Sequence, residues 1–139
     1  MKKISCEKIT EAVAEMTLKS NLYLPSDVKE KLDQALERET NPLARSILKD
    51  LIKNQDITAK SRLPLCQDTG LAVVFVEIGQ EVLIEGGLLY DAINAGIAQG
   101  YTEHYLRKSI VSHPWLRKNS GDNTPAVIHT QLTDGDQLK

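Results

Sequence analysis

The stretch that decides the fold is LAVVFVEIGQEVLIEGGLLYDAINAGIAQG, residues 71–100. Its first eight residues are all apolar except Glu77 and are rich in β-branched side chains, and the run is too short for a typical helix. This pattern indicates a strand covered on both faces. The dipeptide GQ at 79–80 is a turn signal, and EVLI at 81–84 predicts a short second strand that forms a hairpin with the first.

The remainder of that stretch predicts one long helix that continues through the LRKS segment, to about residue 109. Its apolar stripe contains unusually small residues, including Gly96 and Gly100. Because each glycine costs a helix up to about 1 kcal/mol, tertiary contact must offset the loss. We therefore expect another backbone to pack close to this stripe.

Three amphipathic helices are predicted before residue 57. The first runs from about Ser5 to Ser20, the second follows Pro25 and Ser26, and the third has Asn41 as its N-cap and Pro42 in its first turn. Their apolar stripes are Ile9, Ala12, Val13 and Met16; Val28, Leu32, Ala35 and Leu36; and Ala44, Ile47, Leu48 and Leu51.

The final part of the sequence predicts a loop and a further strand. Residues 112–125 are loop-like in composition, AVIHTQL at 126–132 alternates like a strand, and a TDGD turn follows. We expect an α+β fold in which an N-terminal layer of three helices packs with a small β-sheet and one long helix. A single domain over residues 1–139 would contain a helical layer at 1–57 and a strand-helix-strand part at 61–139. The strand close to the last residue suggests a fragment of a longer protein.

Composition narrows the class of protein. Seventeen Lys and Arg against nineteen Asp and Glu give a net charge of −2, and no basic-aromatic pattern is present, which disfavours nucleic-acid binding. No apolar run approaches the roughly 18 residues of a membrane span, and no secretory signal follows the N-terminal lysines. The two cysteines, Cys6 and Cys66, lie far apart and favour a reduced, cytoplasmic setting over a disulfide framework.

A short loop, PLCQDTG at 64–70, places Cys66, Gln67 and Asp68 immediately before the apolar strand. Pro64 disfavours a helix at the preceding residue and Gly70 permits a turn into the strand, so the loop is held at the mouth of a buried element. Ligand residues often lie on loops held by rigid scaffolds. From the residues alone, a packed free cysteine with Asp68 capping a turn stays open.

The PLCQDTG loop followed by an apolar strand resembles the iron-sulfur-dependent hydro-lyases, the class I fumarase and tartrate dehydratase family, and in particular the N-terminal part of their α subunit. The similarity extends over most of the chain. It includes ERETNPLARSILKDLIKN, AINAGIAQGYTEHYLRKSIV and NTPAVIHTQL.

The resemblance implies a [4Fe-4S] cluster for which Cys66 supplies one of three cysteine ligands. A cluster held by three thiolates leaves one iron open to act as a Lewis acid on substrate. Gln67 would donate to a substrate carboxylate. Asp68 would bind or orient substrate, with proton transfer as a second role, and the base could also come from another part of the protein.

Arg107 in LRKS is the fourth site residue that the resemblance implies. A guanidinium forms two parallel hydrogen bonds with a carboxylate, which suits a dicarboxylic acid substrate. From the residues alone, Arg107 and Lys108 also fit a solvated helix end favoured by the helix dipole. Lys108, Arg117 and Lys118 are assigned to solvent.

Other polar residues carry weaker signals. Asn123 and Thr124 lie where the family lines its site, but a loop that starts a strand explains them equally well. No two of His104, His113 and His129 show metal-ligand spacing, and Cys6 is interpreted as an ordinary thiol.

The function expected from the resemblance is reversible hydration and dehydration of a C4 dicarboxylate, either fumarate and malate or tartrate. The isolated chain would be inactive, because one ligand cysteine cannot hold a cluster. The expected partners are the remainder of the α subunit and a β subunit in an oligomer. The alternative is a subunit-interaction module in which Cys66 is structural.

Overall fold

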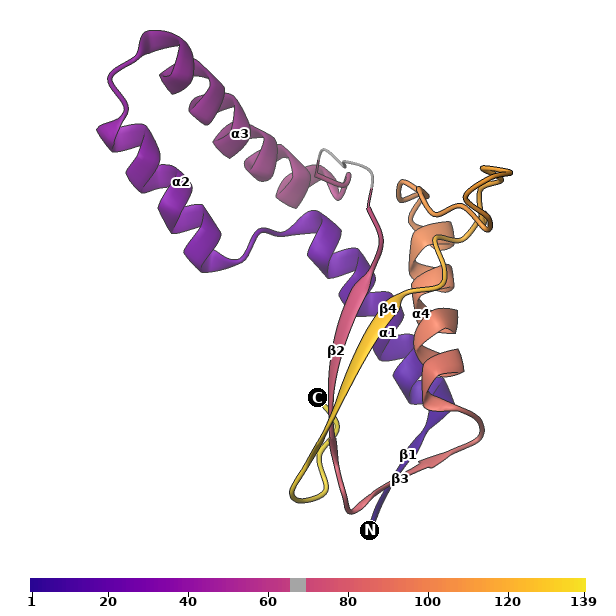
Figure 1. Cartoon of the computed structure of the whole chain (residues 1–139). Helices are drawn as coiled ribbons and strands as arrows, with labels where there is room; N and C mark the ends of the chain where they lie inside the picture. Colours follow the sequence, from indigo (N-terminus) through magenta and orange to yellow (C-terminus); the bar gives the residue numbers. More distant parts are fainter. Residues whose placement is uncertain (66–69) are drawn as a thin grey trace. The chain divides into compact units, whose positions relative to one another are not determined.

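A computed structural model describes residues 1–65 and 70–139, and positions 66–69 fall outside the description. The chain divides into two compact units. One comprises Met1–Leu18 with Asp68–Lys139, and the other comprises Lys19–Gln67. Helix α1 (Cys6–Leu22) contributes to both units. The fold mixes helices with parallel strands, which confirms the predicted α+β class (Figure 1).

The first unit contains two parallel strand pairs. Strand β2 (Val73–Gly79) pairs with β4 (Val127–Thr133), and β1 (Lys2–Ser5) pairs with β3 (Val82–Glu85). The predicted hairpin of β2 with β3 is therefore wrong, and β1 was not predicted. The physical reason lies just after β2, where the backbone N–H groups of Gln80 and Glu81 donate to carbonyls of the 133–135 turn rather than to β3.

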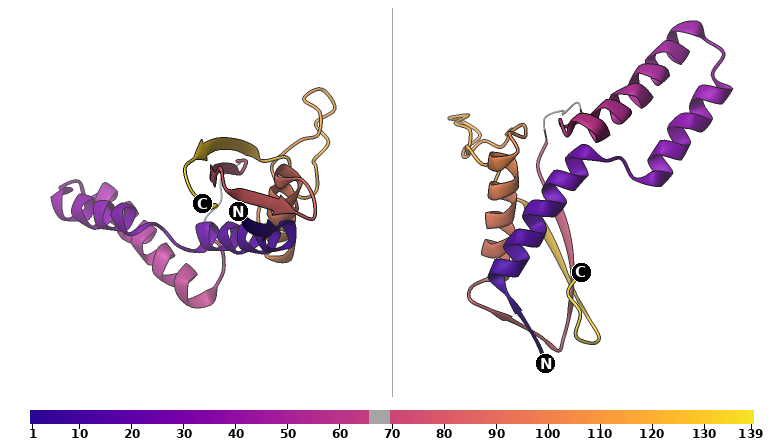
Figure 2. Two further views of the ribbon diagram at one scale, coloured as in Figure 1. Left: turned by 90° about the horizontal axis from the view of Figure 1, so that it is seen from below. Right: turned by 180° about the vertical axis from the view of Figure 1, so that it is seen from behind.

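Helices α1 and α4 (Leu89–Glu103) both lie on one face of the β2 and β4 pair (Figure 2). The buried core joins apolar side chains of these elements: Ile9, Val13, Val76, Ala92, Ile93 and Ile97. The opposite face of the pair is open in this structure, since Val73 is 50% and Phe75 is 76% exposed. The prediction that both faces of this strand are covered is wrong here.

The small residues of α4 pack closely against α1, as predicted. A Cβ added at Gly96 would lie 2.7 Å from the Val13 Cβ, and one added at Gly100 would lie 2.8 Å from the Thr17 Cβ. This contact also corrects the predicted stripe of α1. Ile9 and Val13 are buried, but Ala12 and Met16 are exposed, because the face that meets α4 is completed by Ala14 and Thr17.

Helix α4 is shorter than predicted. It ends at Glu103, and the LRKS segment lies beyond it. Tyr105 has a left-handed φ of 54°, and the Leu106 N–H donates to the Tyr101 carbonyl at 3.1 Å. Since a non-glycine residue with a left-handed φ breaks the helical path, the chain continues as an irregular segment.

The second unit contains the helices α2 (Ser26–Arg38) and α3 (Pro42–Ser61), which pair with each other (Figure 1). Asn41 caps α3 as predicted, because its side chain accepts from the N–H groups of Leu43 and Ala44. The Arg45 guanidinium donates to the Leu36 and Glu39 carbonyls, both at 2.7 Å, and so joins the end of α2 to α3. None of the helices in the described part of the chain has the length and apolarity that crossing a bilayer demands.

Candidate functional site

Three of the four predicted site residues, Cys66, Gln67 and Asp68, lie outside the described residues. The fourth, Arg107, lies in the irregular segment that follows α4 and is exposed. The residue before it, Leu106, is only 3% exposed and anchors this segment in the unit. Arg107 therefore follows a buried attachment point and does not lie at the end of a helix.

A fully buried carboxamide joins this segment to the start of β2. Asn123 is 0% exposed, and its Oδ1 accepts from the N–H groups of Ser109 at 2.7 Å and Ile110 at 3.1 Å. Its Nδ2 donates to the Gly70 carbonyl in a longer bond of 3.5 Å. The two backbone donors identify which side-chain atom is the oxygen. Residues just after Arg107 and just after the CQDT sequence thus contact the same side chain.

The position of Asn123 is itself determined by its surroundings. Its N–H donates to Ser120 Oγ at 3.2 Å, and its φ of 64° is left-handed, a conformation that asparagine tolerates better than most residues. Three residues later, the Ala126 N–H donates to Asn94 Oδ1 on α4 at 2.8 Å. The Val127 N–H then donates to the Ala72 carbonyl and starts the pairing of β4 with β2.

Asp122 organises the same loop. Its Oδ1 accepts from Thr124 Oγ1 at 2.8 Å and from the Thr124 N–H at 3.0 Å. The hydroxyl bond from Thr124, and then the bond from its N–H, lower the pKa of the Asp122 carboxyl below its usual value, because both stabilise the ionised form. Thr124 is thereby given a structural role in this loop.

Ser109, the last residue of LRKS, has a buried side-chain oxygen. Its Oγ has no hydrogen-bond partner among the residues that the structure describes. A buried polar atom of this kind normally finds a partner, because leaving it unpaired costs free energy. Ser109 also supplies one of the two amides that Asn123 holds, two residues after Arg107.

The histidines form no metal site in the described ranges, 1–65 and 70–139. The His129 ring stacks on Phe75 with 5.1 Å between centroids, and His113 Nδ1 accepts from the Trp115 N–H. No group of three or more His, Cys, Asp or Glu side chains in these ranges is arranged to hold a metal ion. Cys6 lies half-buried with its Sγ 3.8 Å from the Leu88 carbonyl oxygen. The described residues therefore supply no ligand set for an iron-sulfur cluster, and Cys66 stays the predicted ligand.

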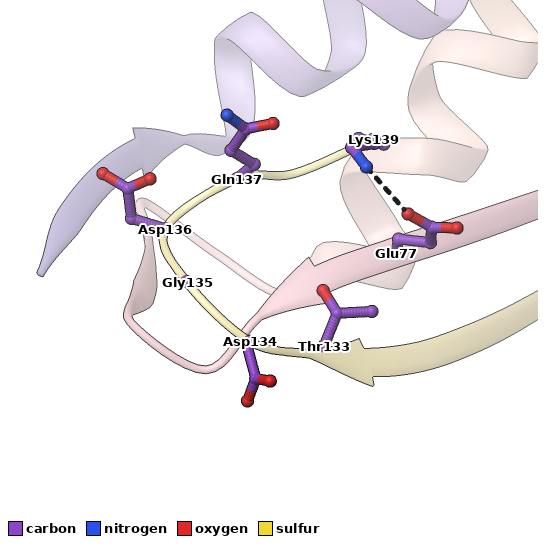
Figure 3. Close-up of a pocket in the computed structure, with 7 residues that line it drawn as sticks. All are labelled: Glu77, Thr133, Asp134, Gly135, Asp136, Gln137 and Lys139. Atoms are coloured by element: carbon purple, nitrogen blue, oxygen red, sulfur yellow. Dashed lines mark hydrogen bonds and ion pairs between the residues drawn. The ribbon is translucent and has the colours of Figure 1, made fainter.

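A hollow of about 190 Å³ lies at the other end of β2, between Glu77 and the turn at 133–139 (Figure 3). Three carboxylates line it, those of Glu77, Asp134 and Asp136, with the Lys139 ammonium 3.2 Å from Glu77. A surplus of negative charge repels a dicarboxylate. This hollow is thus unsuited to the substrate class that the sequence predicts, and the segment around Arg107 is the better candidate site.

Asn123, in the candidate site, is a residue whose role the sequence left open, as it did for Thr124. A polar residue between Asp122 and a Thr-Pro pair is typical of a loop that starts a strand. Local pattern cannot reveal contacts with Ser109 and Gly70, which are 14 and 53 residues away.

Known proteins are similar to this chain over most of its length. A putative L(+)-tartrate dehydratase subunit alpha of Methanocaldococcus jannaschii is 35% identical over 117 residues, covering 84% of this chain and 41% of that protein. The aerobic class I fumarate hydratase of Escherichia coli K12 is 33% identical over 122 residues, covering 86% of this chain and 22% of that protein. An L(+)-tartrate dehydratase subunit alpha of Escherichia coli UTI89 is 29% identical over 141 aligned residues, covering 99% of this chain and 46% of that protein.

The chain spans less than half the length of each of these relatives. The model of the family described as fumarate hydratase (Fumerase) matches residues 10–139, nearly all of the chain. This chain therefore belongs to the fumarate hydratase (Fumerase) family.

Proposed function

We propose that this chain is part of a hydro-lyase that reversibly adds water to, or removes it from, a C4 dicarboxylic acid. The observation that carries the proposal is the family match over residues 10–139, together with relatives named as fumarate hydratase and tartrate dehydratase. The partners we propose are the remaining polypeptide of a longer α subunit and a β subunit, in a cytoplasmic oligomer.

Arg107 is the proposed carboxylate clamp. Its exposed side chain follows a buried anchor, and it belongs to a segment that shares Asn123 with the residue just after the CQDT sequence. Two parallel N–H donors would bind one carboxylate and orient the substrate. Gln67 and Asp68 are proposed to bind and orient the rest of the substrate.

Cys66 is the proposed contribution of this chain to a [4Fe-4S] cluster whose other two ligands come from elsewhere in the protein. When bound, such a cluster supplies a Lewis-acidic iron for the hydroxyl of the substrate.

Anaerobic reconstitution of this chain with its partner polypeptides, iron and sulfide tests the proposal. The assembly should turn brown and hydrate fumarate or dehydrate tartrate, and Cys66→Ser should abolish both. Cys6→Ser is the matched control, because Cys6 contacts only the Leu88 carbonyl among the described hydrogen-bonding groups, and it should preserve both. A colourless assembly, or a brown one that Cys66→Ser leaves unchanged, would contradict the proposal.

A second candidate, a subunit-interaction module, is favoured by one observation. The outer face of the β2 and β4 pair exposes Val73, Phe75 and Val127, although parallel sheets are normally covered on both faces. The two functions are compatible. A chain that is only an interaction module, however, should bind its partner and develop no chromophore at any iron concentration.

A further inference from the structure

The irregular segment that carries Arg107 is attached on both sides of this residue. Before Arg107, the buried Leu106 donates its N–H to the Tyr101 carbonyl at the end of α4. After it, the N–H groups of Ser109 and Ile110 donate to the Asn123 carboxamide. Arg107 lies between these points, outside any helix or strand. The loop that carries Asn123 adds two bonds to the same segment, from Asn119 Nδ2 to the Lys108 carbonyl at 2.9 Å and from the Ser120 N–H to the Ile110 carbonyl at 2.8 Å. The backbone position of Arg107 therefore depends on Leu106 before it and on this loop after it, in which Asn123 is the buried member.

The second attachment point connects Arg107 to the sheet. Asn123 Nδ2 reaches the Gly70 carbonyl, three residues before β2. The chain after Asn123 is bound to α4 through Asn94 and to β2 through the bond from Val127 to Ala72. A displacement of the Asn123 carboxamide would thus break contacts with two separate segments, residues 109–110 and Gly70.

The burial of Asn123 explains why this connection is specific. A carboxamide with no exposed surface must satisfy its donors and acceptors within the protein, and Oδ1 does so with two backbone N–H groups at once. Removing it leaves two backbone donors that need another partner. The adjacent Ser109 hydroxyl has no partner among the described residues. It therefore supplies no hydrogen bond that would hold the segment once the carboxamide is removed.

We propose that Asn123 is a positioning residue: its carboxamide fixes the Arg107 segment relative to the start of β2, and thereby places the guanidinium for carboxylate binding. The inference rests on the proposed function for the role of Arg107. That Asn123 holds the segment in position is a separate claim. It can be tested in the 139-residue chain without measuring enzyme activity.

Amide hydrogen exchange in the 139-residue chain tests the holding of the segment. Asn123→Gly removes the carboxamide but keeps a residue that adopts a φ of 64° without strain. The amides of Ser109 and Ile110 should exchange roughly tenfold faster or more, whereas those of Ile93 and Ile97 in α4 should not change. Asp122→Ala is the matched control, because it deletes two hydrogen bonds to Thr124 in the same loop and none to residues 106–110.

Asn123→Asp keeps the test decisive if the glycine variant fails to fold. Aspartate tolerates a positive φ and still offers an oxygen to the N–H groups of Ser109 and Ile110, but it cannot donate to the Gly70 carbonyl. Slow exchange should return at Ser109 and Ile110 in this variant. Wild-type exchange at these amides in Asn123→Gly, or fast exchange in Asn123→Asp, would overturn the inference.

A double-mutant cycle in the reconstituted assembly tests the positioning of Arg107. Asn123→Gly should lower kcat/KM for the dicarboxylate roughly tenfold and Arg107→Lys roughly 10- to 100-fold, and the double variant should lose little more than Arg107→Lys alone. Fully additive losses, or wild-type kinetics in Asn123→Gly, would overturn the inference while the proposed function stands. Wild-type kinetics in Arg107→Lys would instead overturn the proposed clamp, and the exchange experiment would still decide whether Asn123 holds the segment.

Discussion

Gly96 of α4 lies directly against Thr10 of α1, where a Cβ on the glycine would come within 2.6 Å of the Thr10 carbonyl oxygen. Real Cβ atoms do not approach a backbone oxygen so closely, so the two helices can pack at this distance only through a glycine. The Thr10 hydroxyl reinforces the crossing by donating to the Ala92 carbonyl at 3.0 Å. The α1 and α4 pair covers one face of the sheet. Their contact determines where the segment after α4 leaves the core.

Gly96→Ala should therefore destabilise the protein. The gain in helix propensity is about 1 kcal/mol, but overpacking a close backbone contact costs about 1–3 kcal/mol, and the site also meets the Val13 side chain. Urea unfolding followed by circular dichroism should show a lower midpoint. Gln99→Ala, an exposed position on the same helix, is the control and should change the midpoint little. A Gly96→Ala protein more stable than the wild type would show that the helices separate at low cost.

Asn41→Ala should destabilise α3 by about 1 kcal/mol, because it removes a side-chain acceptor for two N–H groups of the first turn. Asn41→Asp should retain stability, since a carboxylate caps equally well and interacts favourably with the helix dipole. Urea unfolding measured at the helical circular dichroism signal compares the two. Equal losses in both variants would mean that the cap contributes no stability.

Asp122 should contribute stability that depends on pH. Its pKa is lowered in the folded state from a usual value near 3.8, so the folded protein binds this proton less readily than the unfolded chain. The contribution is fully present above about pH 4 and is lost as the pH falls through the folded-state pKa. The difference in urea midpoint between wild type and Asp122→Asn should be largest at pH 7 and shrink in acid. A difference that does not vary with pH would contradict the lowered pKa.

Arg107→Lys should lower kcat/KM of the reconstituted enzyme roughly 10- to 100-fold, because a point charge replaces a planar donor that forms two bonds to one carboxylate. Steady-state kinetics with fumarate and with tartrate measure the effect, which should appear in KM if the contact is equally strong in ground and transition states. Arg117→Lys makes the same exchange at an exposed loop position and should leave the kinetics unchanged. Equal behaviour of the two variants would remove Arg107 from the site.

Local sequence signals determined much of this protein. The apolar period predicted the helices, Asn41 and Pro42 marked the start of α3, and consecutive apolar residues predicted β2. The CQDTG and LRKS motifs and their order along the chain indicated the family. Each motif, and each helix or strand signal, depends on residues within a few positions of one another, and such spacing is directly visible in a sequence.

Only the tertiary structure decided which elements meet. Strand β3 pairs with β1 instead of β2, α1 turns Ala14 and Thr17 inward instead of Ala12 and Met16, and α4 ends before Arg107. Asn123 likewise acquires its role from partners 13 to 53 residues away. Strand order, helix rotation and buried polar contacts are all set by competition among long-range contacts, which local pattern does not encode.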